Sequence, residues 1–146
     1  MLNANARTLS AKRKVALSMN EANSMIVFPE VTFDDDNQTM TILNGTEGTY
    51  DYKDIKECVI ANESAKHRGK EKPFAVTVVT SPLPVGLFTE RAFYVGLKIT
   101  LMDGTVLAIY TSKTATRNNT DLHKADTQAA QKIKKVLDRI IKDHNA

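Results

Sequence analysis

Apolar positions along this chain follow two spacings, one typical of β-strands and one typical of an α-helix. Residues 92–111 form two runs rich in β-branched and aromatic side chains around Asp103-Gly104, a pattern that predicts a β-hairpin. From Asp121 apolar residues recur at helical spacing and predict a helix over residues 121–143, preceded by good capping residues at 118–120. Such a helix needs an apolar sheet to cover, so the upstream strands must supply one. Its expected buried stripe contains Ala129, Ile133, Val136, Leu137 and Ile140, with Leu122 and Ala125 extending it if the helix starts that early.

The upstream half of the chain predicts the remaining strands of a mainly β domain. Residues 25–33 are expected to form one strand kinked at Pro29, because proline cannot donate to a sheet ladder. Further strands are predicted at residues 38–43, 49–52, 55–61 and 73–80. We therefore expect one domain over residues 24–146, with about seven antiparallel strands followed by the closing helix.

The register of the last hairpin follows from burial. A two-residue loop would place the apolar side chains of its two strands on opposite faces of the sheet. A three-residue loop, Met102-Asp103-Gly104 with the glycine in the left-handed conformation, pairs Leu101 with Thr105 and brings those side chains onto one face. Because a slip of one residue would move a whole apolar set into water, we predict the three-residue loop.

Composition is that of a soluble globular domain. The chain has 146 residues, of which 42% are hydrophobic and 25% charged. No run approaches the roughly 20 apolar residues of a membrane-spanning helix, and no N-terminal stretch resembles a secretory signal. Cys58 is the single cysteine, which suits a reducing compartment, so a cytoplasmic location is expected. No base is visibly paired with Cys58, and we expect it to act as a small hydrophobe.

The net charge of +3 belongs to the N-terminal residues. Residues 1–23 carry four basic side chains and one acidic one, which leaves sixteen of each in the remaining 123 residues. The predicted folded part is therefore neutral, and it has no basic groove interleaved with aromatic residues. Both observations argue against a nucleic-acid partner.

Residues 1–23 are expected to form a flexible or loosely docked basic arm, as chain termini often do. A partner-docking or membrane-surface helix and an organelle transit peptide are the alternatives, and the arm is also a candidate for self-association. The sequence does not decide between them, and it leaves the oligomeric state open.

No constellation of residues points to catalysis, a cofactor or a metal. His67, His123 and His144 lack metal-ligand spacing, and there is no nucleophile elbow, glycine-rich nucleotide fingerprint or CxxC motif. The acidic run at residues 34–36 predicts a turn rather than a calcium loop, because the glycine and glutamate of an EF-hand are absent. We predict a protein that is not an enzyme.

Two loops are the candidate interaction sites. Residues 62–72 hold the densest basic cluster of the predicted domain, which is either an anion-binding loop or a solvated loop tip. Residues 81–90 carry apolar side chains that either tuck under the sheet or dock a partner. The candidate anion-binding residues are Lys66, Arg68, Lys70 and Lys72, and the candidate partner-binding residues are Leu83, Val85, Leu87 and Phe88.

The order of elements, with a helix directly after the last of about seven strands, resembles the pleckstrin-homology-like fold. Two short motifs of the similar bacterial domains are present, Tyr52-Lys53-Asp54-Ile55 and the strand, Asp-Gly turn and strand at residues 99–109. The resemblance covers roughly residues 24–143. It implies a partly open barrel of two sheets plugged by the helix, in domains that mostly bind peptides, proteins or lipid headgroups. The phosphoinositide-binding subset usually has Lys/Arg pairs in the first hairpin, where this chain has aspartates, so no lipid-binding residues are carried over.

We therefore expect a non-catalytic binding or scaffold domain that recognises a protein or peptide through an exposed sheet edge or the 81–90 loop. The alternative is a peripheral membrane-surface module that binds anionic lipid through the basic arm and residues 66–72.

Overall fold

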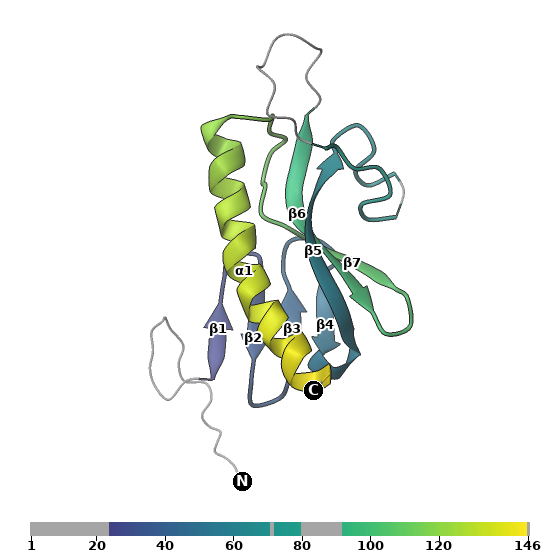
Figure 1. The fold of residues 1–146 in the computed structure, drawn as a ribbon, viewed down its shortest axis with the longest axis vertical. Helices are drawn as coiled ribbons and strands as arrows, with labels where there is room; N and C mark the ends of the chain where they lie inside the picture. Colours follow the sequence, from purple (N-terminus) through teal and green to yellow (C-terminus); the bar gives the residue numbers. More distant parts are fainter. Residues whose placement is uncertain (1–23, 71, 80–91, 146) are drawn as a thin grey trace.

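The computed structural model describes residues 24–70, 72–79 and 92–145. This part of the chain is mainly β with one C-terminal α-helix, as expected (Figure 1). The predicted arm at residues 1–23 lies outside the described residues. In chain order the elements are β1 (Met25–Val27), β2 (Val31–Asp34), β3 (Thr39–Ile42), β4 (Gly48–Asp51), the short 3-10 helix η1 (Tyr52–Asp54), β5 (Ile55–Ser64), β6 (Phe93–Leu101), β7 (Val106–Tyr110) and α1 (Asp121–Asn145).

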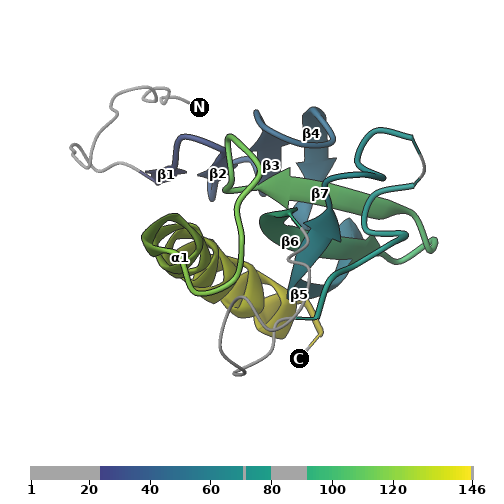
Figure 2. The same cartoon turned by 90° about the horizontal axis from the view of Figure 1, so that it is seen from above.

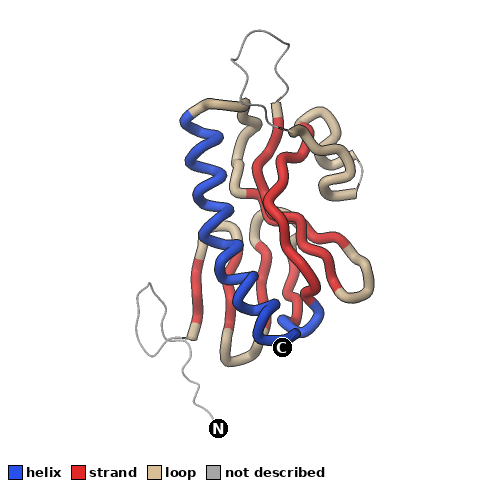
Figure 3. The backbone as a smooth tube through the Cα atoms, in the orientation of Figure 1, coloured by secondary structure: helices blue, strands red, loops and turns tan. Residues whose placement is uncertain are grey.

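The strands form two antiparallel sheets, one in the order β1-β2-β3-β4 and the other in the order β5-β6-β7 (Figure 3). The prediction of a partly open barrel needs correction here, because the ladders of the described strands do not close around one axis. α1 lies across one side of both sheets, as the two views in Figures 1 and 2 agree.

The two sheets are joined at one corner by the loop between β3 and β4. Thr46 N–H donates to the carbonyl of Ala108 at 2.9 Å, and Tyr110 N–H donates to the carbonyl of Asn44 at 3.0 Å. Gly45 lies between them at a φ of +140°, and a Cβ there would lie 1.9 Å from the Ala108 carbonyl oxygen. Only glycine permits this close approach of the loop to the edge of β7.

The first predicted strand is two strands in the structure. β1 and β2 pair with each other, with Ile26 opposite Phe33, and the chain reverses between them at Pro29. Phe28 N–H donates to the carbonyl of Val31 at 2.9 Å and closes this turn. The prediction of one kinked strand was wrong because proline, with its fixed φ and missing N–H, serves a reversal as well as a kink.

The prediction of a strand at residues 73–80 was also wrong over residues 73–79, the part of it that the structure describes. Residues 72–79 make only an isolated bridge, between Thr77 and Glu63. The backbone turns at Phe74, whose φ is +59°, and its ring stacks on Tyr110 with centroids 5.6 Å apart. That ring lies over Gly96, where an added Cβ would be 3.0 Å from it. The turn that places the aromatic ring on the sheet prevents a continuous strand.

The register of the last hairpin is confirmed. Leu101 N–H donates to the carbonyl of Thr105 at 2.8 Å, and Gly104 has a φ of +91°. Ile99 then lies opposite Leu107, and both side chains are buried.

The C-terminal helix is confirmed, and its start is capped by Thr120, whose Oγ1 accepts the His123 N–H at 3.1 Å. Its buried stripe is shifted slightly from the predicted one. Ala130 is buried where Ala129 was expected, and Leu122 is 47% exposed. Ala125 is exposed too, because the first two turns are held by polar contacts instead, such as Ser112 Oγ donating to Asp126 Oδ2 at 2.7 Å. The buried residues of the helix are Ala130, Ile133, Leu137 and Ile140.

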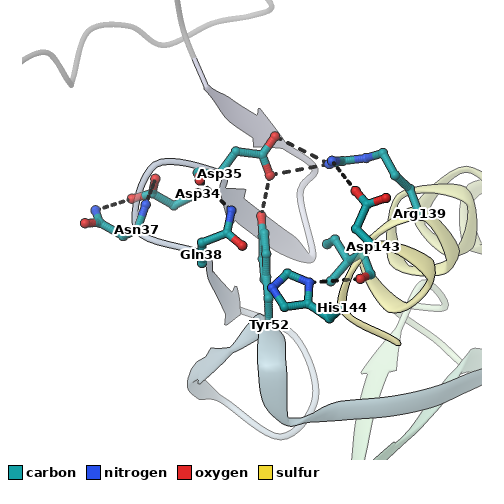
Figure 4. Close-up of polar contacts among 9 residues, drawn as sticks. Asp34, Asp35, Asn37, Gln38, Tyr52, Arg139, Asp143 and His144 are labelled. Atoms are coloured by element: carbon teal, nitrogen blue, oxygen red, sulfur yellow. Dashed lines mark hydrogen bonds and ion pairs between the residues drawn. The ribbon is translucent and has the colours of Figure 1, made fainter. Parts of the chain in front are cut away.

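The end of the helix is fixed to the turn between β2 and β3 by polar contacts (Figure 4). Asp35 accepts a hydrogen bond of 2.8 Å from the Tyr52 hydroxyl and forms an ion pair of 3.4 Å with Arg139. Burial, reinforced by that carboxylate, raises the pKa of Tyr52 above its usual value. The predicted turn at residues 34–36 is confirmed, since Asp34 Oδ1 accepts the Asn37 N–H at 3.0 Å. The aspartates therefore close a turn and anchor the helix.

We predict that Ile133→Asp abolishes cooperative unfolding of the domain. Ile133 is fully buried, and a carboxylate there would lose its hydration without gaining a partner, at a cost of several kcal/mol. Gln131→Asp makes the same change in charge at an exposed position of the same helix and should leave the thermal midpoint nearly unchanged. Circular dichroism melting distinguishes them, and equal midpoints for both variants would contradict a closing role for α1.

Candidate functional site

The outer edge of β5 is where an extended piece of chain already docks. Val78 N–H donates to the carbonyl of Asn62 at 2.8 Å, and Ser64 N–H donates to the carbonyl of Val76 at 2.9 Å. Thr77, between them, forms the isolated bridge to Glu63. We call residues 76–78 the edge segment, because they add an outermost strand-like piece to the β5-β6-β7 sheet.

Alternation along the edge segment directs the Thr77 backbone away from β5. In an antiparallel pair the N–H and C=O of one residue point to the same side, and those of the next residue point to the other. Since Val76 and Val78 bond to β5, the Thr77 N–H and C=O face outwards, and Thr77 is exposed. Within the described ranges, no other backbone group hydrogen-bonds to them.

A cavity of about 450 Å³ lies beside the edge segment. Ser64 Oγ and His67 Nδ1 are 3.1 Å apart in its wall, and Lys66 is exposed at its side. Its lining is both polar and apolar, and the described lining residues include no acidic side chain. They are Ser64, Ala65, Lys66, His67, Val76, Thr77, Val78 and Ala92.

A second cavity, of about 350 Å³, is lined by Gly45, Thr46, Glu63, Arg68, Gly69, Pro73 and Tyr110. Glu63 is only 1% exposed and accepts a hydrogen bond from the Tyr110 hydroxyl. Burial, and then this hydrogen bond, raises the pKa of Tyr110 above its usual value. A buried carboxylate with its donor in place is a strong positional constraint, because either group alone would be costly to bury.

Arg68 completes this cluster and fixes the loop that follows β5. Its guanidinium carbon lies 4.4 Å from the ring centroid of Tyr94 and 4.3 Å from that of Tyr110. Its Nε is buried and has no hydrogen-bond acceptor among the described residues, so the two ring faces provide its electrostatic partner. Together with Phe74 on Tyr110, this holds the loop on the outer face of the sheet.

The four predicted anion-binding residues do not converge on one cavity. Lys66 lines the cavity beside the edge segment, and Arg68 lines the second cavity against the tyrosine rings. Lys70 and Lys72 are exposed and line neither cavity. The predicted partner-binding residues Leu83, Val85, Leu87 and Phe88 lie outside the described residues, so their role stays a prediction.

Cys58 is 6% exposed and lies in the main core. Burial raises the pKa of its thiol to about 12, which keeps it protonated at neutral pH and fits a small apolar residue. The three histidines have separate surroundings: His67 lies beside Ser64, His123 packs on Phe93, and His144 packs on Tyr52. Over residues 24–70, 72–79 and 92–145, no three His, Cys, Asp or Glu side chains are grouped to hold a metal ion.

No helix in the described part of the chain combines the length and apolar character needed to cross a membrane. Comparison with protein-family models, curated proteins and solved structures found no match for this chain.

We predict that Tyr110→Phe lowers the free energy of unfolding by about 1–3 kcal/mol, because buried Glu63 loses its hydrogen-bond donor. Tyr94→Phe also keeps an aromatic ring beside Arg68, but Tyr94 is only partly buried and its hydroxyl makes no hydrogen bond to the Glu63 carboxylate. It should cost much less. Urea unfolding at neutral pH measures both, and equal losses would show that the Glu63–Tyr110 pair does not stabilise the loop.

Proposed function

We propose that this chain is a non-catalytic binding module that captures an extended peptide segment of a partner protein along the outer side of the edge segment. The observation that carries the proposal is the outward-facing backbone of exposed Thr77 beside a cavity of about 450 Å³. Peptides commonly bind by adding a strand to a sheet edge, with the backbone providing affinity and side-chain pockets providing specificity.

The fixed loop supports this proposal. Recognition loops bind more tightly when the free protein already holds their bound conformation, since less conformational freedom is lost on binding. Here Arg68 on two tyrosine rings and Phe74 on Tyr110 hold the loop that leads into the edge segment. The edge segment is therefore presented by a rigid support rather than by an unanchored connection.

The proposed fold type is pleckstrin-homology-like. It is supported by the succession of a four-stranded sheet, a three-stranded sheet and a helix that follows the last hairpin. The proposal of peptide binding does not depend on this assignment, since it rests on the edge segment and its cavity.

The test is selection of a displayed library of random linear peptides on the full chain. Enriched peptides should bind the wild type and Thr77→Ala equally, but should lose at least tenfold in affinity with Thr77→Pro. Proline removes the outward N–H, whereas Val78 N–H and the Val76 carbonyl keep their bonds to β5.

Thr77→Ala is the matched control, because it loses the same hydroxyl and keeps the N–H. Both variants should melt at nearly the wild-type temperature. Failure to enrich any peptide, or equal binding by Thr77→Pro and Thr77→Ala, would contradict capture by strand addition.

A further inference from the structure

We infer that the cavity beside the edge segment is a pocket for an anionic side chain, best matched by the phosphate group of a phosphorylated serine in the captured peptide. The inference rests on the proposed function and specifies the chemical class of its partner. It is carried by the side chains that converge there: Lys66, His67, Ser64 and Thr77.

Among the described residues that line the pocket, Lys66 is the only Lys, Arg, Asp or Glu, although residues 24–146 as a whole are neutral. Lys66 is exposed, lines the pocket, and makes no ion pair with any described acidic residue. The described lining contains no Asp or Glu. A single-signed pocket with partly apolar walls concentrates its field on a bound counter-charge, so an anion is the favoured occupant.

The Ser64–His67 pair keeps a donor free for the anion in every protonation state. If His67 Nδ1–H donates to Ser64 Oγ across 3.1 Å, the serine O–H remains available. If the serine donates instead, His67 carries its proton on Nε2, and that N–H remains available. The surplus donor therefore does not depend on which tautomer the ring adopts.

The local turn does not account for this pair of side chains. The backbone carbonyl of Ser64 already accepts the N–H groups of His67 and Arg68, at 3.1 and 3.0 Å, and these bonds close the turn. The turn is thus closed by backbone bonds before the hydrogen bond between the hydroxyl and the imidazole is counted. They are instead placed together in a cavity wall.

The neighbouring arginine is excluded from this role. Arg68 lies on the rings of Tyr94 and Tyr110 and lines the other cavity, together with Glu63. Lys70 and Lys72 line neither cavity. Of the four basic side chains in this loop, Lys66 is thus the one positioned for the pocket.

A phosphate suits the pocket better than a carboxylate does. Its three terminal oxygens can accept from Lys66, from the Ser64–His67 pair and from Thr77 together, and each such bond is charge-assisted. The volume of about 450 Å³ also leaves room for the larger group.

The test uses N-acetyl-phosphoserine-N-methylamide as a probe, titrated into the full chain and followed by amide NMR. Saturable shifts are expected at Ser64, Lys66, His67 and Thr77. Lys66→Ala should weaken binding about tenfold, which corresponds to one charge-assisted contact. Lys72→Ala removes the same charge from the same loop outside the pocket, and should change affinity less than twofold.

The capped glutamate and capped serine analogues complete the series, with weaker binding expected for the first and none for the second. Equal weakening by Lys66→Ala and Lys72→Ala would mean diffuse attraction and would overturn the pocket. The pocket would also be overturned if phosphatidylserine vesicles bound in a Lys66-dependent manner while the capped phosphoserine did not bind.

The phosphoserine titration and the test of peptide capture can fail independently of each other. The capped amino acid is too short to add a strand, so Thr77→Pro should bind it as Thr77→Ala does, since both variants lose the same hydroxyl. Loss of phosphoserine binding with peptide capture intact would remove only the pocket, and the reverse result would remove only strand addition.

Discussion

Removal of the apolar stripe of α1 from water is the interaction on which the remaining structure depends. Ile133, Leu137 and Ile140 lie fully or almost fully buried among side chains of both sheets. Each contributes about 1.5–3 kcal/mol of apolar burial before entropy is counted. Because the helix occupies one side of both sheets, it fixes which face of each strand is internal. The proposed binding surface lies instead at an edge of the β5-β6-β7 sheet.

β5 connects this core to the proposed binding surface. Cys58 lies in the main core beneath the helix, while Glu63 turns to the opposite face and pairs with Tyr110. That pair and the stacked Arg68 hold the loop that returns as the edge segment. Buried groups on the outer face, and Val78 packed against the main core, thus support the edge segment in addition to its own two hydrogen bonds. This arrangement explains how a short segment with an exposed Thr77 can remain docked.

Local patterns predicted the features that depend on a single element or a single turn. The register of the last hairpin followed from Gly104 and from the burial of its apolar side chains, and the closing helix followed from its spacing. The buried face of the helix was harder to predict from the sequence. Ala129 and Ala130 are adjacent, and packing against the sheets decides that Ala130 is the buried one. Leu122 was misassigned because the first turns are held by His123 on Phe93 and by polar contacts to Asp126 instead.

Features that join distant parts of the chain could not be read from the sequence. Glu63 and Tyr110 are 47 residues apart, and neither neighbourhood signals that a buried carboxylate meets a phenol. The basic cluster of this loop was recognised from the sequence. That Arg68 and Lys66 line different cavities could not be predicted, because it depends on where the tyrosine rings lie. The pairing of the edge segment with β5 beside Ser64 was not predicted. Residues 73–80 read as one regular strand, and the sequence gives no sign of the turn at Phe74. The alternation of apolar residues after Pro73 was the available signal, and it indicated extended chain without indicating its partner.

Amide hydrogen exchange along the edge segment tests the central claim, that this segment is docked on β5 with one backbone face open. The Val78 and Ser64 amides should be protected, since each is hydrogen-bonded across the pair, and the Thr77 amide should exchange rapidly. Exchange at Val78 as fast as at Thr77 would show that the edge segment is not docked, and strand addition at this site would then have no support.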